Sequence, residues 1–112
     1  MIRVPQGCRV WARSQATDLR KGFAGLAGLV QRELGCDLLA GDIFVFISRS
    51  RRLVKVLQWD GTGLSLYSKR LGRGQFAEIW RHRHGDQIEL TRRALYQLLE
   101  GADVTRAQRW RK

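Results

Sequence analysis

The chain has 112 residues, of which 21 are lysine or arginine and 10 are aspartate or glutamate, so its net charge is +11. This length predicts one domain with a substantial core. No apolar run approaches the roughly 20 residues of a membrane-spanning helix, and the stretch after Met1 lacks the pattern of a secretory signal. We therefore expect a cytoplasmic protein with no membrane partner. The charge favours a nucleic-acid partner, the alternative being that it only keeps the chain in solution.

The first part of the chain predicts a short strand followed by a helix. Residues 9–13 alternate polar and apolar side chains, as a half-buried strand does. Thr17 or Asp18 can cap the N-terminus of the helix, and Gly35 is a typical helix stop. The apolar face of this helix consists of Leu19, Phe23, Leu26, Ala27, Val30 and Leu34.

The same helix contains Gly22, Gly25 and Gly28 in a slowly drifting row. Each glycine costs about 1 kcal/mol relative to alanine inside a helix. We favour the interpretation that the missing side chains let another backbone approach closely. The alternative is that a strong apolar face simply tolerates them.

Three strands are expected in the middle of the chain. Residues 42–48 contain five consecutive large apolar side chains, which predicts a central strand buried on both faces. Residues 53–59 and 64–70 are the next two strands, and the Asp-Gly pair in 60–63 is a strong hairpin signal, because glycine supplies the positive φ of the turn. One face of the hairpin carries Leu57, Trp59, Leu64 and Leu66, and the other carries Val54, Val56 and Tyr67.

The last third of the sequence is less regular. Residues 72–85 are ambiguous, since apolar residues at helical spacing are surrounded by glycines and cations. Residues 88–90 can form a short strand. Thr91 is a typical N-cap, followed by an apolar stripe and by Gly101 as a stop. The stripe consists of Ala94, Leu95, Leu98 and Leu99.

Together these elements predict an α+β fold. We expect a single domain over residues 1–104, in which an antiparallel β-meander is packed against an N-terminal and a C-terminal helix. Residues 105–112 form a basic C-terminal tail.

The sequence contains no recognisable catalytic, cofactor or metal motif. The glycine pair at Gly72 and Gly74 lacks the Lys-Ser/Thr of a phosphate loop. His82 and His84 are one close pair, which is more typical of a solvated basic loop than of a zinc site with four ligands. We predict that the protein is not an enzyme and carries no cofactor or metal. The role of the two histidines is left open.

Basic residues gather at strand ends. A hairpin that closes at residues 60–63 places residues 55 and 68 roughly opposite each other, so two basic clusters meet at the end of the sheet remote from that turn. We favour a phosphate-binding surface over a solvated rim. The candidate nucleic-acid-binding residues are Arg20, Lys21, Arg49, Arg51, Arg52, Lys55, Lys69, Arg70 and Arg73.

Aromatic side chains are a second candidate feature. Trp59, Trp80, Trp110 and Tyr67 can stack on unpaired bases. The strand pattern around Trp59 favours a core position. For Trp110, near the C-terminus, base stacking and docking onto the domain are equally good interpretations.

Several ordered motifs resemble a bacterial transposition family. Residues 17–23 and 25–27 read Thr-Asp-Leu-Arg-Lys-Gly-Phe and Gly-Leu-Ala. They resemble the start of the small accessory protein encoded by the second reading frame of insertion sequences of the sixty-six family. The resemblance covers about residues 1–101. Its other motifs lie at residues 44–46, 49–52, 55–57, 59–64, 69–71, 74, 76, 90–91 and 98–101.

The resemblance implies a non-catalytic accessory protein of transposition, with a separate transposase that supplies the DDE-type chemistry. We expect the chain to bind DNA through its arginine-rich surface and to assist that transposase. The alternative is a protein-interaction module that docks on the transposase without binding DNA. A nuclease is the least favoured hypothesis. The DNA recognised, the step affected and a homo-oligomeric state are left open.

Overall fold

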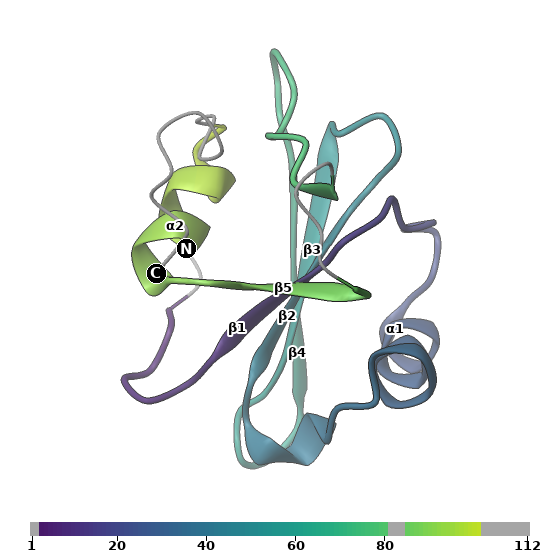
Figure 1. Ribbon diagram of the computed structural model, residues 1–112, viewed down its shortest axis with the longest axis vertical. Helices are drawn as coiled ribbons and strands as arrows, with labels where there is room; N and C mark the ends of the chain where they lie inside the picture. Colours follow the sequence, from purple (N-terminus) through teal and green to yellow (C-terminus); the bar gives the residue numbers. More distant parts are fainter. Residues whose placement is uncertain (1–2, 81–84, 102–112) are drawn as a thin grey trace.

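The computed structural model describes residues 3–80 and 85–101, which form one five-stranded sheet with helical segments on both sides (Figure 1). The sheet order is β4-β3-β2-β1-β5. The strands are β1 (Val10–Arg13), β2 (Ile43–Ile47), β3 (Leu53–Trp59), β4 (Leu64–Arg70) and β5 (Gln87–Leu90). The predicted α+β class and every strand expected from the sequence are therefore confirmed.

The prediction of a purely antiparallel meander is wrong, because the sheet is mixed. Strand β1 pairs parallel with β2, with Trp11 opposite Phe44, and antiparallel with β5 on its other side, with Trp11 opposite Glu89. The helical crossover between β1 and β2 brings the chain back in the same direction, which is what parallel pairing requires. Only β2, β3 and β4 form the expected meander.

Strand β2 is central and buried on both faces, as its unbroken apolar run predicts. All five of its residues are buried. Phe44 and Phe46 pack on one face with Leu26 and Val30, whereas Ile43, Val45 and Ile47 belong to a second cluster on the opposite face. We call these the α1-side and α2-side cores, after the helices that cover them. Figure 1 shows the two helices on opposite sides of the sheet.

The first helix begins later than expected and is internal to the chain, not N-terminal. Helix α1 spans Phe23–Leu29 and continues as the π-helical turn η1 (Val30–Leu34). Neither Thr17 nor Asp18 caps it, because the N-cap position is Gly22. The backbone N–H of Thr17 donates to the carbonyl of Ile47 at 2.9 Å, within the loop before the helix. Gly35 ends the helical segment with φ 65°, as predicted.

The row of glycines in this helix does not receive another backbone. The atoms nearest to a side chain built at Gly25 belong to the side chain of Lys21, and those nearest at Gly28 belong to the guanidinium of Arg32. Nothing lies within 4 Å of such a position at Gly22. The interpretation of close backbone approach is therefore not supported. Gly28 instead leaves room for a cation of its own helical segment.

The C-terminal helix matches its sequence signals. Helix α2 spans Arg92–Leu99, and Thr91 accepts a hydrogen bond from the amide of Ala94 at 3.0 Å. Gly101 follows with φ 90°. The predicted stripe is buried against the α2-side core: Ala94, Leu95, Leu98 and Leu99.

The β3–β4 hairpin closes through residues 60–63, with Trp59 opposite Leu64. The carboxylate of Asp60 accepts hydrogen bonds from the amides of Thr62 and Gly63, each at 3.0 Å. These amide donors lower the pKa of Asp60. Gly61 has φ 105°, which confirms the positive φ expected from the Asp-Gly pair.

Two further segments complete the described part. The short 3-10 helix η2 (Leu38–Ala40) precedes β2. Between β4 and β5 the chain is irregular from Gly72 to Ile79, yet Phe76, Ala77 and Ile79 are buried in the α2-side core. Within residues 3–80 and 85–101, none of the helices has the length and apolar character needed to cross a bilayer.

Candidate nucleic-acid interface

The basic segments predicted to meet do lie at one end of the sheet, opposite the 60–63 turn (Figure 1). Lys55 is paired with Ser68, as expected for a hairpin that closes at residues 60–63. Beyond the strands, the amide of Leu71 donates to the carbonyl of Arg52 at 3.0 Å, and the amide of Phe76 donates to the carbonyl of Arg51 at 2.6 Å. The loop after β2 and the segment after β4 are thus held side by side.

These cations lie on both faces of the sheet. Lys55 lies two residues from Leu57, and Arg70 is paired with Leu53, so both belong to the α1 side. Lys69 is paired with Val54 of the α2-side core and lies on the opposite face. Strand neighbours alternate between faces, so the run Lys69-Arg70 cannot act as one patch on a single face.

Four of the nine predicted residues form hydrogen bonds or an ion pair with other residues of the protein. Arg51 adopts φ 60° and donates to the carbonyl of Phe76 at 3.3 Å and to the side chain of Gln75 at 3.1 Å. Lys69 donates to the carbonyl of Leu99 at 2.6 Å, and Lys55 donates to that of Lys21 at 3.3 Å. The fourth residue is Arg20, described next.

Arg20 is held by a local ion pair. Its guanidinium lies 2.7 Å from the carboxylate of Asp18, and its side chain is 90% exposed. Hydrogen bonds from the Arg20 side chain and amide hold the pKa of Asp18 well below its usual range. The adjacent carboxylate offsets the positive charge of Arg20, so this residue offers less to a phosphate than an unpaired arginine would.

The remaining five residues are exposed and, within residues 3–80 and 85–101, their side chains form no hydrogen bond or ion pair. We call them the open cations: Lys21, Arg49, Arg52, Arg70 and Arg73. Lys21 lies near Lys55 on the α1 side of the sheet, because its carbonyl accepts a hydrogen bond from the Lys55 side chain. The sequence identified all five, but it could not separate them from the four engaged residues.

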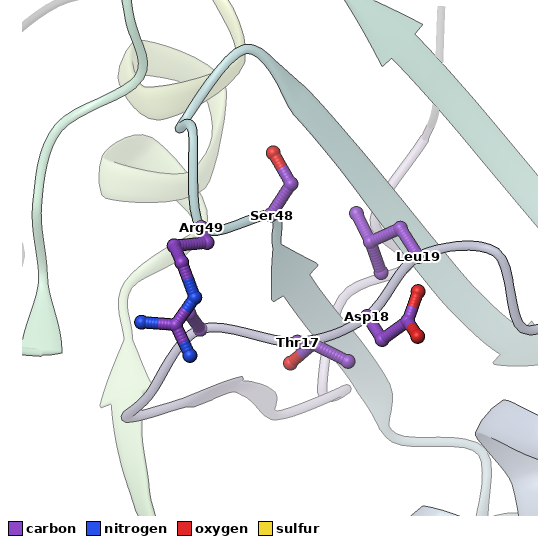
Figure 2. A pocket seen from close by; sticks show the side chains of 6 residues that line it. Thr17, Asp18, Leu19, Ser48 and Arg49 are labelled. Atoms are coloured by element: carbon purple, nitrogen blue, oxygen red, sulfur yellow. The ribbon is translucent and has the colours of Figure 1, made fainter.

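Arg49 also borders two shallow hollows. One, of about 350 Å³, is lined by residues 16–19 together with Ser48 and Arg49 (Figure 2). The other, of about 390 Å³, is lined by Gln15, Ala16, Arg49 and Trp80. Sequence patterns single out neither Gln15 nor Ala16, because the hollows depend on how the loop after β1 packs beside the loop after β2.

The described residues contain no cluster of three or more histidine, cysteine, aspartate or glutamate side chains able to hold a metal ion. Their carboxylates instead make local structural contacts, such as that of Glu33 with Arg13 at 2.6 Å and that of Asp42 with the Trp11 indole at 3.3 Å. His82, His84 and Trp110 lie outside the described residues, as does the expected boundary between residues 1–104 and the tail at 105–112.

The position of Lys69 predicts a structural effect. Its ammonium group contacts the last turn of α2, where positive charge is favourable. Lys69→Met should lower the free energy of unfolding by about 0.5–2 kcal/mol, measured by urea denaturation. The control Lys21→Met removes the same charge from an exposed position and should change stability by less than about 0.5 kcal/mol. Equal stability of the two variants would contradict a structural role for Lys69.

Fold and charge thus define a small basic α+β domain with a mixed sheet. The sequence matches the family described as "IS66 Orf2 like protein" over residues 8–109, and the chain belongs to this family. Its members are accessory proteins of IS66 transposition and are not known enzymes. The family expected from the sequence motifs is therefore confirmed.

Two relatives from Sinorhizobium fredii are similar over nearly their whole length. The uncharacterized protein y4hO is 41% identical over 99% of this chain and 96% of its own, and the uncharacterized protein y4jC is 33% identical over 97% and 92%. No solved structure matches the chain.

Proposed function

We propose that the protein binds DNA phosphates through the open cations and thereby assists the IS66 transposase, without itself cutting or joining DNA. The observation that carries this proposal is the gathering of exposed, unengaged cations at one end of the sheet, among the residues that the structure describes. Arginine suits this role because its planar guanidinium donates two parallel hydrogen bonds to a phosphate.

The local arrangement favours an external anion. Arg52 immediately precedes β3, and Arg70 ends β4, which is paired with β3. Arg73 lies three residues after Arg70. Like charges held so close repel one another, and bound phosphates would remove that repulsion. Contacts of this kind position a protein on DNA but do not read its sequence.

Docking on the transposase is the second candidate. An acidic segment of that protein would satisfy the same open cations. The two functions differ in their salt dependence on DNA, because each phosphate contact releases counterions from the duplex.

The test compares two triple variants of equal net charge. In the first, Arg52, Arg70 and Arg73 become glutamine. In the second, glutamine replaces three exposed arginines that do not belong to the open cations: Arg3, Arg32 and Arg93. The affinity of each protein for a short duplex is measured by fluorescence anisotropy between low and physiological salt.

For the wild type we expect a log–log salt slope of about −3.6 to −4.5, which corresponds to four or five phosphate contacts. The first variant should flatten this slope by about 2.7, since each lost contact removes about 0.9. The second should change it by less than about one, and the duplex should stay uncut in Mg²⁺. Equal slopes for the two variants would contradict the proposed interface. Negligible duplex binding by the wild type, with transposase binding lost in the first variant, would favour docking.

A further inference from the structure

We propose that the hollow between Arg49 and Trp80 receives an unpaired nucleobase, so that the protein binds single-stranded or locally melted DNA more tightly than intact duplex. This inference rests on the proposed function and adds a preference for DNA structure to it. It follows from the placement of an aromatic ring, an open cation and an amide around one hollow of about 390 Å³.

The aromatic component is Trp80. Its indole N–H donates to the carboxylate of Glu78 at 2.8 Å, and its ring packs against the α2-side core while remaining partly exposed. A ring fixed in this way loses little conformational freedom when a base stacks on it. Single-strand-binding proteins use such aromatic faces, and every base can stack on them.

The polar components come from two other loops. Arg49, in the loop after β2, is exposed, and its side chain makes no hydrogen bond or ion pair within the described part of the chain. Gln15 lines the same hollow and carries an amide that can pair with a base edge. Arg49 also borders the hollow of about 350 Å³ that Figure 2 shows beside Thr17 and Ser48. The backbone of a bound strand can pass along that hollow.

A base within a duplex cannot use this arrangement. Its faces are already covered by neighbouring base pairs, and only an unpaired or extruded base can be placed on a side-chain ring. The open cations bind the phosphates of single and double strands alike, so the preference for the single strand must come from the Trp80 hollow.

The experiment measures affinity for an oligothymidylate and for a duplex of equal length at the same salt concentration. Wild-type protein should bind the single strand more tightly. Trp80→Leu should weaken single-strand binding by about 5- to 150-fold, the range for loss of one stacked base. It should change duplex binding by less than about twofold. The matched control Trp59→Leu alters a partly exposed tryptophan near the other end of the sheet and should leave both affinities unchanged.

Two further variants keep the test independent of folding. Trp80→Phe preserves an aromatic face and should retain most of the single-strand affinity, but it should lose the quenching of tryptophan emission that stacking causes. Arg49→Gln leaves the ring in place and should weaken single-strand binding. Equal losses for both DNA forms in Trp80→Leu, or none, would overturn this inference and leave the proposed function intact. Failure of the arginine slope test would instead refute the proposed function itself.

Discussion

Phe46→Ala should lower the free energy of unfolding by about 3–5 kcal/mol, which is the usual cost of truncating a buried phenylalanine. Phe46 is fully buried at the centre of β2, in the α1-side core. Its ring lies between the sheet and α1, so the truncation leaves a cavity that neither element can fill without moving. Equilibrium denaturation in urea measures the change through the shift in midpoint.

The control for this prediction is Leu39→Ala. Leu39 lies on η2 and is 62% exposed, so its truncation should change stability by less than about 0.5 kcal/mol. A loss in Phe46→Ala no larger than in this control would show that α1 does not pack on β2 as described. The proposed DNA binding would be affected as well, because Lys21 lies just before α1 and its carbonyl accepts a hydrogen bond from Lys55 of β3.

The antiparallel part of the sheet could be predicted because its signals are local. Alternation along residues 53–59 and 64–70, together with the turn residues Asp60 and Gly61, fixes both the register and the face of every side chain in the hairpin. The structure confirms that Leu57 and Leu66 share one face and that Val56 and Tyr67 share the other.

The position of β1 could not be predicted in the same way. Residues 9–13 have the pattern of a strand, but nothing near them shows that this strand pairs with β2 across an intervening helix and with β5 from the far end of the chain. The start of α1 was missed for a related reason. Thr17 has a side chain suited to a helix cap. Its backbone N–H instead donates to the carbonyl of Ile47, thirty positions away in the sequence, and this bond holds Thr17 in a loop before the helix.

The site shows the same division between local and distant signals. Sequence spacing placed the cations of residues 49–55 and 69–73 at one end of the sheet, because the hairpin determines their position. It could not show that Lys69 contacts α2 or that Arg51 contacts Gln75, since both contacts depend on long-range packing. Arg51 is therefore a poor probe of phosphate binding, whereas Arg52, Arg70 and Arg73 can be changed without removing a hydrogen bond of the described structure.

Gly61→Val should destabilise the protein by about 1–3 kcal/mol through backbone strain alone. Gly61 has φ 105°, a conformation that β-branched residues strongly disfavour. No atom lies within 4 Å of a Cβ built there, so the side chain itself meets open space. The loss should appear as a lower urea midpoint, and DNA affinity measured well below that midpoint should be unchanged, because residues 60–63 lie at the end of the sheet opposite the open cations.

Gly63→Val is the matched control for this strain. Gly63 belongs to the same turn, also has open space around a built Cβ, and does not adopt a positive φ. Valine there should cost less than about 0.5 kcal/mol, because the left-handed strain at Gly61 is absent. If both variants lose the same stability, the cost arises from a general need for glycine in the turn and not from φ at Gly61. If Gly61→Val weakens DNA binding while the fold stays intact, residues 60–63 contact DNA directly, and the interface is not confined to the opposite end of the sheet.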